Sequence, residues 1–405
     1  MTGSLVIMVS FGCGDAPTAA EPDASLAIDA ALDTDAALPD AVDPPNIPER
    51  IETGSGFTPA IAFDAAGRPS VAYRRYTATT STEILIATRG SGGWSSQTVL
   101  TLSEGTMSDV DFEIGPAGRR VLGYVTTTGG QDYRGGASVE DSGAWTHRWL
   151  AYLPDAGSLA LEGDVAITPQ GDVHIMWPLV TPPAETASGF RHLATAGAGM
   201  IEETLGARVQ GTQFGIGAHP RSIAIVADAG LSMFTLQNGD APFEAHLSSR
   251  TAMANGPVML ASQVASLPGF GLYPRASGAA LVKTPTGQVA IGAVSYSNQT
   301  AFHVLREGAT WTHHTVGPVP YDSSAWCATV MDDGTAAIVV YDEVGTTITE
   351  HDLRLILVAP DGMVRDQVID LDVDTGKCAI RAQGGSVHVV YRRSDDSLYY
   401  QRVDP

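Results

Sequence analysis

An alternating run of carboxylates is the clearest candidate for metal chemistry in this sequence. Asp370, Asp372 and Asp374 are followed by Gly376, which gives a D-x-D-x-D-x-G pattern. Alternate carboxylates on a turning loop can converge on a hard cation such as Ca²⁺, which takes several oxygen ligands. The glycine falls one place later than in an EF-hand loop, and Arg381 stands where the bidentate glutamate would be. The run therefore predicts either a calcium site at these three aspartates or a plain acidic surface loop.

Aromatic and cationic side chains in two irregular segments are the candidate ligand-binding residues. The long segment Ser249–Ser277 contains the first group, and a connection one repeat later contains the second. The candidates are Phe270, Tyr273, Arg275, Tyr321 and Trp326. Aromatic faces beside a few polar groups suit sugar rings or peptide side chains. In the alternative reading, the long segment only packs over an irregular part of the fold.

Two of the three cysteines occupy matching places in consecutive repeats. Cys327 and Cys378 each lie seven residues before a turn glycine, Gly334 and Gly385 respectively. On neighbouring inner strands they can form a disulfide if their Cα atoms come within about 7 Å. The alternative is a pair of buried free thiols that pack as small apolar groups. With no C-x-x-C motif and no Cys/His cluster, a structural zinc site is not expected.

The third cysteine, Cys13, follows the short apolar run Leu5–Phe11 and Gly12. An Asp/Ala/Pro tract follows it, and this tract has no Lys or Arg before Arg50. This arrangement resembles a bacterial lipoprotein signal, which implies cleavage before Cys13 and lipidation of its thiol. We therefore expect a signal segment over 1–13, a disordered tether over 14–45 and a folded domain over 46–405. The alternative is a disordered N-terminus with a free thiol.

Motifs of nucleophilic, phosphate-binding and metalloprotease chemistry are missing from the sequence. There is no G-x-S-x-G elbow, no Gly-rich phosphate loop and no H-E-x-x-H. His174 and His388 recur at one place in different repeats, three after the turn glycine, which favours a packing role over catalysis. The net charge of −22 argues against a nucleic-acid partner and against electrostatic attachment to an anionic membrane.

The elements that must position these residues form a repeat of about fifty residues. In each copy a glycine turn leads into an apolar strand, and most of these strands end in an aromatic residue. The copies are GRPSVAY from Gly67, GRRVLGY from Gly118, GDVHIMW from Gly171, GQVAIGAV from Gly287, GTAAIVVY from Gly334 and GSVHVVY from Gly385. Such a period in strand-like segments predicts an all-β chain that folds as a single β-propeller of four-stranded antiparallel blades. We expect seven blades, with six as the alternative.

Two repeats depart from the pattern. The fourth lacks the motif, and its turn is expected at His219–Arg221. The last repeat shows no fourth strand after Tyr399–Gln401, and a spare strand-like segment, Ile47–Glu52, precedes the first repeat. This segment is expected to complete the last blade and so to remove an open sheet edge. The Gly-Trp pair at Trp94 and its copies at Trp145 and Trp311 are expected to pack between blades.

The repeat resembles the sialidase-like, BNR-type propellers of secreted bacterial proteins over roughly residues 46–405. That group includes glycosidases, polysaccharide lyases and binding proteins. The S-x-D-x-G-x-T-W boxes that specify a sialidase occur only as fragments such as Asp332–Thr335. The resemblance therefore implies the fold and leaves enzymatic activity open.

These features together predict a surface-anchored, extracytoplasmic monomer that binds a glycan, peptide or protein without turnover. The first alternative is an extracellular carbohydrate-active enzyme, either a glycosidase or a polysaccharide lyase. The second is a purely structural envelope component. Contact with the membrane is expected only through the lipid anchor on the bacterial cell envelope or surface, and secretion is the alternative location. Calcium is the only cofactor that the residues suggest.

Overall fold

The computed structural model describes residues 47–405 with short gaps and contains strands with one turn of 3-10 helix, Pro116–Gly118. The gaps are residues 55, 79–80, 103–105, 129–131, 154–162, 180–188, 197–198, 206–222, 228–230, 238–242, 251–259, 268–274, 297–298, 320, 344–350 and 375. Within the described part, no helix is long and apolar enough to cross a membrane.

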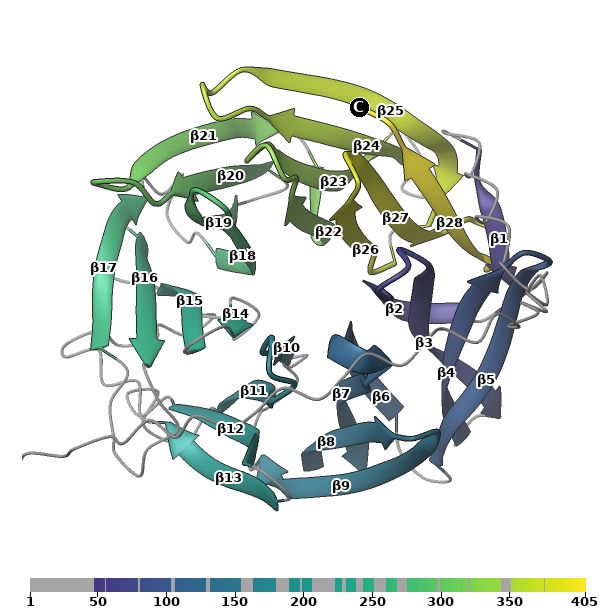
Figure 1. The fold of residues 1–405 in the computed structure, drawn as a ribbon. Helices are drawn as coiled ribbons and strands as arrows, with labels where there is room; N and C mark the ends of the chain where they lie inside the picture. Colours follow the sequence, from purple (N-terminus) through teal and green to yellow (C-terminus); the bar gives the residue numbers. More distant parts are fainter. Residues whose placement is uncertain are drawn as a thin grey trace, which may run out of the picture. The chain divides into compact units, whose positions relative to one another are not determined.

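The described strands form seven four-stranded antiparallel sheets, the blades of a propeller (Figure 1). Blade 1 consists of β2 (Gly56–Phe63), β3 (Pro69–Ala78), β4 (Ser81–Gly90) and β5 (Gly93–Leu102). Blade 2 consists of β6 (Thr106–Ile114), β7 (Arg120–Thr128), β8 (Asp132–Asp141) and β9 (Ala144–Leu153). Blade 3 consists of β10 (Asp164–Ile167), β11 (Val173–Leu179), β12 (Gly189–Ala196) and β13 (Gly199–Leu205). Blade 4 consists of β14 (Ile223–Ala227), β15 (Leu231–Gln237), β16 (Phe243–Arg250) and β17 (Leu260–Leu267). Blade 5 consists of β18 (Arg275–Thr284), β19 (Gly287–Tyr296), β20 (Gln299–Arg306) and β21 (Thr312–Val319). Blade 6 is β22 (Tyr321–Val330), β23 (Ala336–Glu343), β24 (His351–Val358), β25 (Val364–Val373); blade 7 is β26 (Ala379–Gln383), β27 (Ser386–Arg392), β28 (Leu398–Val403) with β1 (Glu49–Glu52). The predicted fold class is confirmed, and the sheets match the larger of the two expected blade numbers.

The first strand of each blade faces the ring axis. These inner strands contact their neighbours in the order β2, β6, β10, β14, β18, β22, β26 and back to β2 (Figure 1). Glycine closes the turn after most of them. At Gly171 and Gly334 the backbone has φ of 91° and 86°, a left-handed conformation that favours glycine. The repeat thus places one inner strand per blade around a common axis.

The aromatic residue that ends five of the six repeated motifs is buried in the blade core. Each of these side chains is at most 1% exposed: Tyr73, Tyr124, Trp177, Tyr341 and Tyr391. A buried aromatic side chain removes about 150–250 Å² from water, so these positions hold the sheets together. Trp94, near the start of the outermost strand β5, packs between blades as expected. Its ring meets Tyr400 of blade 7 edge-on, with ring centroids 5.2 Å apart.

The ring is closed by β1, which pairs antiparallel with β28 as the outermost strand of blade 7. Two glutamates of β1 also reach into blade 1. Glu49 accepts two hydrogen bonds from Arg89, both 2.9 Å long, and Glu52 accepts one of 2.9 Å from the Tyr73 hydroxyl. The predicted closure by Ile47–Glu52 is therefore confirmed, with β1 beginning at Glu49.

The fourth blade is more regular than its sequence suggests. Its inner strand β14 pairs with β15, with Ala227 opposite Leu231. His219–Arg221, where the turn was expected, lie outside the described residues. The segment Ser249–Ser277 is also not one long connection, because Leu260–Leu267 forms β17, the outermost strand of blade 4. In the sequence, Asp228-Ala229-Gly230 between β14 and β15 resembles the letters Asp64–Gly67 of blade 1, a similarity that sequence reasoning missed.

Candidate functional site

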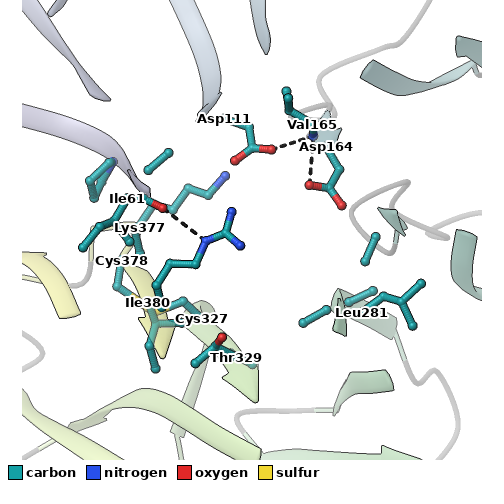
Figure 2. A pocket seen from close by; sticks show the side chains of 18 of the residues that line it. Ile61, Asp111, Asp164, Val165, Leu281, Cys327, Thr329, Lys377, Cys378 and Ile380 are labelled. Atoms are coloured by element: carbon teal, nitrogen blue, oxygen red, sulfur yellow. Dashed lines mark hydrogen bonds between the residues drawn. A yellow bond between two sulfur atoms is a disulfide. The ribbon is translucent and has the colours of Figure 1, made fainter. Parts of the chain in front are cut away.

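A cavity of about 250 Å³ lies on the ring axis and is lined by residues from the inner strands of all seven blades (Figure 2). This volume is slightly below the range of about 300–1,000 Å³ typical of sites for drug-sized ligands. We call it the axial cavity. Its lining is Pro59–Ile61, Val110, Asp111, Glu113, Gly163–Val165, Ala224, Ile225, Ala279–Val282, Trp326–Thr329 and Lys377–Arg381.

The axial cavity has one charged side and one uncharged side. Its charged lining residues all come from the chain around β26, β6 and β10: Asp111, Glu113, Asp164, Lys377 and Arg381. The described lining residues from β14, β18 and β22 carry no charge; most are apolar, including Leu281 and Trp326, and Thr329 adds a hydroxyl. Figure 2 shows Asp111 and Asp164 across the cavity from Leu281. A ligand with one polar face and one apolar face would satisfy both sides.

Two ion pairs of the charged side span blade 1. Lys377, just before β26, pairs with Asp109 of β6, and Arg381 of β26 pairs with Glu113 of β6. Between them, Nε of Arg381 donates a 3.2 Å hydrogen bond to the carbonyl of Ile61 on β2. Asp109 is only 2% exposed, and its Oδ2 also accepts a 3.2 Å hydrogen bond from the Gly163 amide. These contacts join blades 7, 1 and 2, and the residue just before blade 3, at the cavity wall.

The two other carboxyl groups of the cavity wall, Asp111 and Asp164, are neighbours. Asp111 accepts a 2.7 Å hydrogen bond from the Val165 amide, and Asp164 accepts one of 2.6 Å from the Ile225 amide. Burial raises the pKa of Asp164 well above its usual value. The nearby charge of Asp111 and a hydrogen bond between the two carboxyl groups raise it further. Asp164 therefore retains its proton at pH values where an isolated carboxyl group has lost its own.

One position of the repeat joins neighbouring blades at three interfaces. Asp111 and Asp164 lie seven residues before their turn glycines, the same place that Cys327 and Cys378 occupy. The two cysteines form a disulfide between blades 6 and 7, with Cα atoms 5.8 Å apart. The aspartates make the equivalent links to Val165 and Ile225 through hydrogen bonds. The spacing noted for the cysteines also identifies these aspartates, which sequence reasoning missed.

Of the five candidate ligand-binding residues, Trp326 lines the axial cavity. Its side chain is half-buried and packs edge-on against Phe302, with ring centroids 5.5 Å apart. Phe270 and Tyr273 lie outside the described residues. Arg275 and Tyr321 begin β18 and β22, and the structure describes their backbone only. The predicted grouping of all five is therefore not tested.

The acidic run at the end of blade 6 pairs with arginines. Asp370 accepts hydrogen bonds of 2.7 and 2.8 Å from Arg393, and Asp374 pairs with Arg392. For Asp372 the structure describes the backbone only. In the described part of the chain, no three His, Cys, Asp or Glu side chains form a group that could hold a metal ion. These contacts favour ion pairing over the calcium site, and Cys13 lies outside the described residues.

No known family profile matches the chain, and no curated protein matches it in sequence. Solved structures do share its fold. A protein of unknown function from Dyadobacter fermentans superposes with a TM-score of 0.50 at 11% identity, over 88% of this chain and 98% of that one. A lectin from Aleuria aurantia, in complex with Fucα1-6GlcNAc, gives a TM-score of 0.46 at 12% identity, over 80% of this chain and 98% of that one.

A sialidase from Trypanosoma rangeli, in complex with sialic acid, gives a TM-score of 0.43 at 10% identity, over 80% of this chain and 59% of that one. At such identities the similarity concerns the fold alone. The seven four-stranded sheets of the described residues themselves identify the chain as a β-propeller.

Proposed function

We propose that this protein binds a single sugar unit of a glycan in the axial cavity and does not chemically change it. One observation carries the proposal: a cavity of about 250 Å³ on the ring axis opposes a charged, hydrogen-bonding side to an apolar side that includes Trp326. A sugar ring has the matching character, because its hydroxyl groups donate and accept hydrogen bonds while its C–H face is apolar.

Different residues of the cavity wall would contact different parts of the sugar. Asp111 and Asp164 supply carboxyl oxygens that accept hydrogen bonds from hydroxyl groups, and Arg381 supplies a guanidinium that donates them. Trp326 supplies an aromatic face for the apolar side of the ring. The charged groups are already held by backbone amides and ion pairs. Little side-chain freedom is therefore lost on binding, which favours affinity.

The contacts of the carboxyl groups favour binding over hydrolysis. Glycoside hydrolysis uses two carboxyl groups about 5–9 Å apart, one protonated and one ionised. Here Asp111 and Asp164 are hydrogen-bonded to each other, while Glu113 is paired with Arg381. Both carboxyl groups also accept hydrogen bonds from backbone amides, so they are engaged within the cavity wall and not with each other across a bound sugar.

The test measures binding of a panel of monosaccharides and short glycans by saturation-transfer NMR and calorimetry. Replacing Trp326→Leu removes the flat face and keeps an apolar side chain, so affinity should fall about 30-fold, equivalent to ~2 kcal/mol. Trp145→Leu, on the outermost strand β9, is the matched control and should bind as the wild type does. Unchanged affinity in Trp326→Leu, or an equal loss in both variants, would rule out the cavity as the site.

A second candidate is a carbohydrate-active enzyme, and the raised pKa of Asp164 favours it. A carboxyl group with a raised pKa keeps its proton to higher pH and can act as a general acid. Activity would appear as new reducing ends when the protein is incubated with polysaccharides, and Asp164→Asn should abolish it. Binding of the same glycans without product would assign the protein to the binding class.

We also propose that the propeller is held at the cell envelope as a monomer by a lipid on Cys13. The supporting observations are the apolar run before Cys13 and the acidic tract after it. Mass spectrometry of the protein purified from membranes should show a lipid on Cys13. A Cys13→Ser variant, which cannot carry the lipid, should be released into the soluble fraction. An unmodified Cys13 in the wild-type protein would refute the anchor.

A further inference from the structure

We propose that the Cys327–Cys378 disulfide is a redox control on the axial cavity: its reduction releases the chain segment that carries Lys377 and weakens sugar binding. The inference rests on the proposed function for its second half. The release of the segment stands on the structure independently of any ligand.

Both cysteines line the axial cavity and are next in sequence to residues of its wall. Trp326 precedes Cys327 on β22, and Lys377 precedes Cys378 just before β26. The disulfide therefore joins the blade that carries the aromatic face to the blade that carries the two cations. Any change in this bond acts on both sides of the cavity.

The segment before β26 depends on side-chain attachments. Residues 376–378 form no strand, since β26 begins at Ala379. Two of their attachments to other blades are the disulfide of Cys378 and the ion pair of Lys377 with Asp109. Without the disulfide, the segment keeps the apolar packing of Cys378 and the ion pair of Lys377 among its attachments. That ion pair depends on a flexible lysine side chain, which reaches Asp109 two blades away. Ordering such a side chain costs up to about 2 kcal/mol of rotamer entropy, so the segment should become mobile.

Loss of Lys377 would change the charge of the cavity wall. Asp109 is 2% exposed, and a buried carboxylate that loses its cation is strongly disfavoured. It must then recruit another cation or take up a proton. Arg381 is the other cation that lines the cavity, and it is already engaged with Glu113. The hydrogen-bonding side of the cavity should therefore rearrange once the disulfide is open.

The blades themselves should stay together after reduction. Cys378 belongs to a buried cluster between blades 6 and 7 that includes Val339, Tyr341, Val389 and Tyr391. This apolar contact does not depend on the bond between the sulfurs, and it involves fully buried side chains. Reduction is thus expected to loosen the cavity wall without unfolding the propeller.

A dithiol reagent supplies the two electrons. Its thiolate attacks Sγ of Cys327, the half-buried partner, and the sulfur of Cys378, which is 2% exposed, leaves as a thiolate and takes up a proton. The second thiol of the reagent then attacks the mixed disulfide. This step releases Cys327 as a thiol and leaves the reagent as its own cyclic disulfide.

The experiment compares the purified protein with and without dithiothreitol by amide hydrogen exchange, circular dichroism and calorimetry with the glycan panel. Exchange in the peptide covering 374–381 should become about 10-fold faster on reduction, with the β-sheet spectrum retained. Affinity for the best-binding monosaccharide of the panel should fall about 10-fold. A Cys327→Ser/Cys378→Ser variant should show the exchange rate and affinity of the reduced protein, and dithiothreitol should change neither.

Each result decides a separate part of the proposal. Unchanged exchange at 374–381, or global unfolding on reduction, would overturn the redox control whatever the ligand. Faster exchange with unchanged sugar affinity would overturn the link to the cavity. A protein that binds no sugar even when oxidised would refute the proposed function instead, and the exchange measurement would still decide the release of the segment.

Discussion

Two buried histidines should make the folded protein sensitive to acid. His303 is fully buried, and its Nδ1 lies 3.0 Å from Nε2 of His313. Burial, with a smaller contribution from the charge of His313, lowers the pKa of His303 to about 4. His388 is 7% exposed, and its Nδ1 lies 2.6 Å from the Tyr400 hydroxyl. Burial lowers the pKa of His388 to about 4 as well.

The sign and size of the effect follow from these pKa values. In the unfolded chain a histidine titrates near pH 6.5, so between about pH 6.5 and 4 the unfolded state binds more protons than the folded state. The stabilisation is therefore fully present above pH 6.5 and is lost as the pH falls towards 4. Each histidine should lower the free energy of unfolding by about 1.4 kcal/mol per pH unit, which sums to ~3 kcal/mol each across the window.

Urea unfolding at a series of pH values measures this directly. Many carboxylates also titrate in this pH range. The informative quantity is therefore the difference in the pH dependence of the free energy of unfolding between the wild type and the variants His303→Asn and His388→Asn. Each substitution should flatten the pH dependence by about 1 kcal/mol per unit between pH 6 and 4.5. His147→Asn, at an exposed histidine, is the control. If the variants keep the slope of the wild type, these histidines do not stay neutral in the folded state.

Three further predictions concern the closure, the carboxyl pair and the acidic run. Glu49→Gln should lower the free energy of unfolding by about 2 kcal/mol, because it weakens two charge-assisted hydrogen bonds from Arg89; a thermal or urea melt that matches the wild type would refute this role. Asp164→Asn should gain stability relative to the wild type as the pH rises above about 4, because the raised pKa of Asp164 means that its ionisation costs stability; a difference that does not change with pH would contradict the raised pKa. Millimolar Ca²⁺ should leave the melting temperature unchanged, because Asp370 and Asp374 are paired with arginines. A rise of several degrees would instead support the predicted calcium site.

The repeat allowed most of the fold to be predicted, because each blade carries its own local signals. A glycine with positive φ at Gly171 and a buried aromatic at Trp177 are properties of single repeats, and both can be read from a few consecutive letters. The closing strand was also predictable, since the last repeat lacks a strand and Ile47–Glu52 supplies one. The fourth blade was hard to place in the sequence because it lacks the motif, although Asp228-Ala229-Gly230 resembles the letters Asp64–Gly67 of blade 1.

The site was much harder to predict than the fold. The ion pair between Lys377 and Asp109 joins residues 268 positions apart and exists only because the ring closes. Sequence spacing within one repeat cannot reveal such a contact. Asp111 and Asp164 are different, since they share the repeat position of the cysteines, and comparison of that position across the blades would have found them. Trp326 was identified from its side-chain type alone.

The most direct test of the proposed site is a crystal structure of the protein with the best-binding monosaccharide of the panel. The sugar should lie in the axial cavity, with its apolar face against Trp326 and hydroxyl groups within hydrogen-bond distance of Asp111 or Asp164. Density for the sugar on an outer blade surface, with the axial cavity holding only water, would contradict the account.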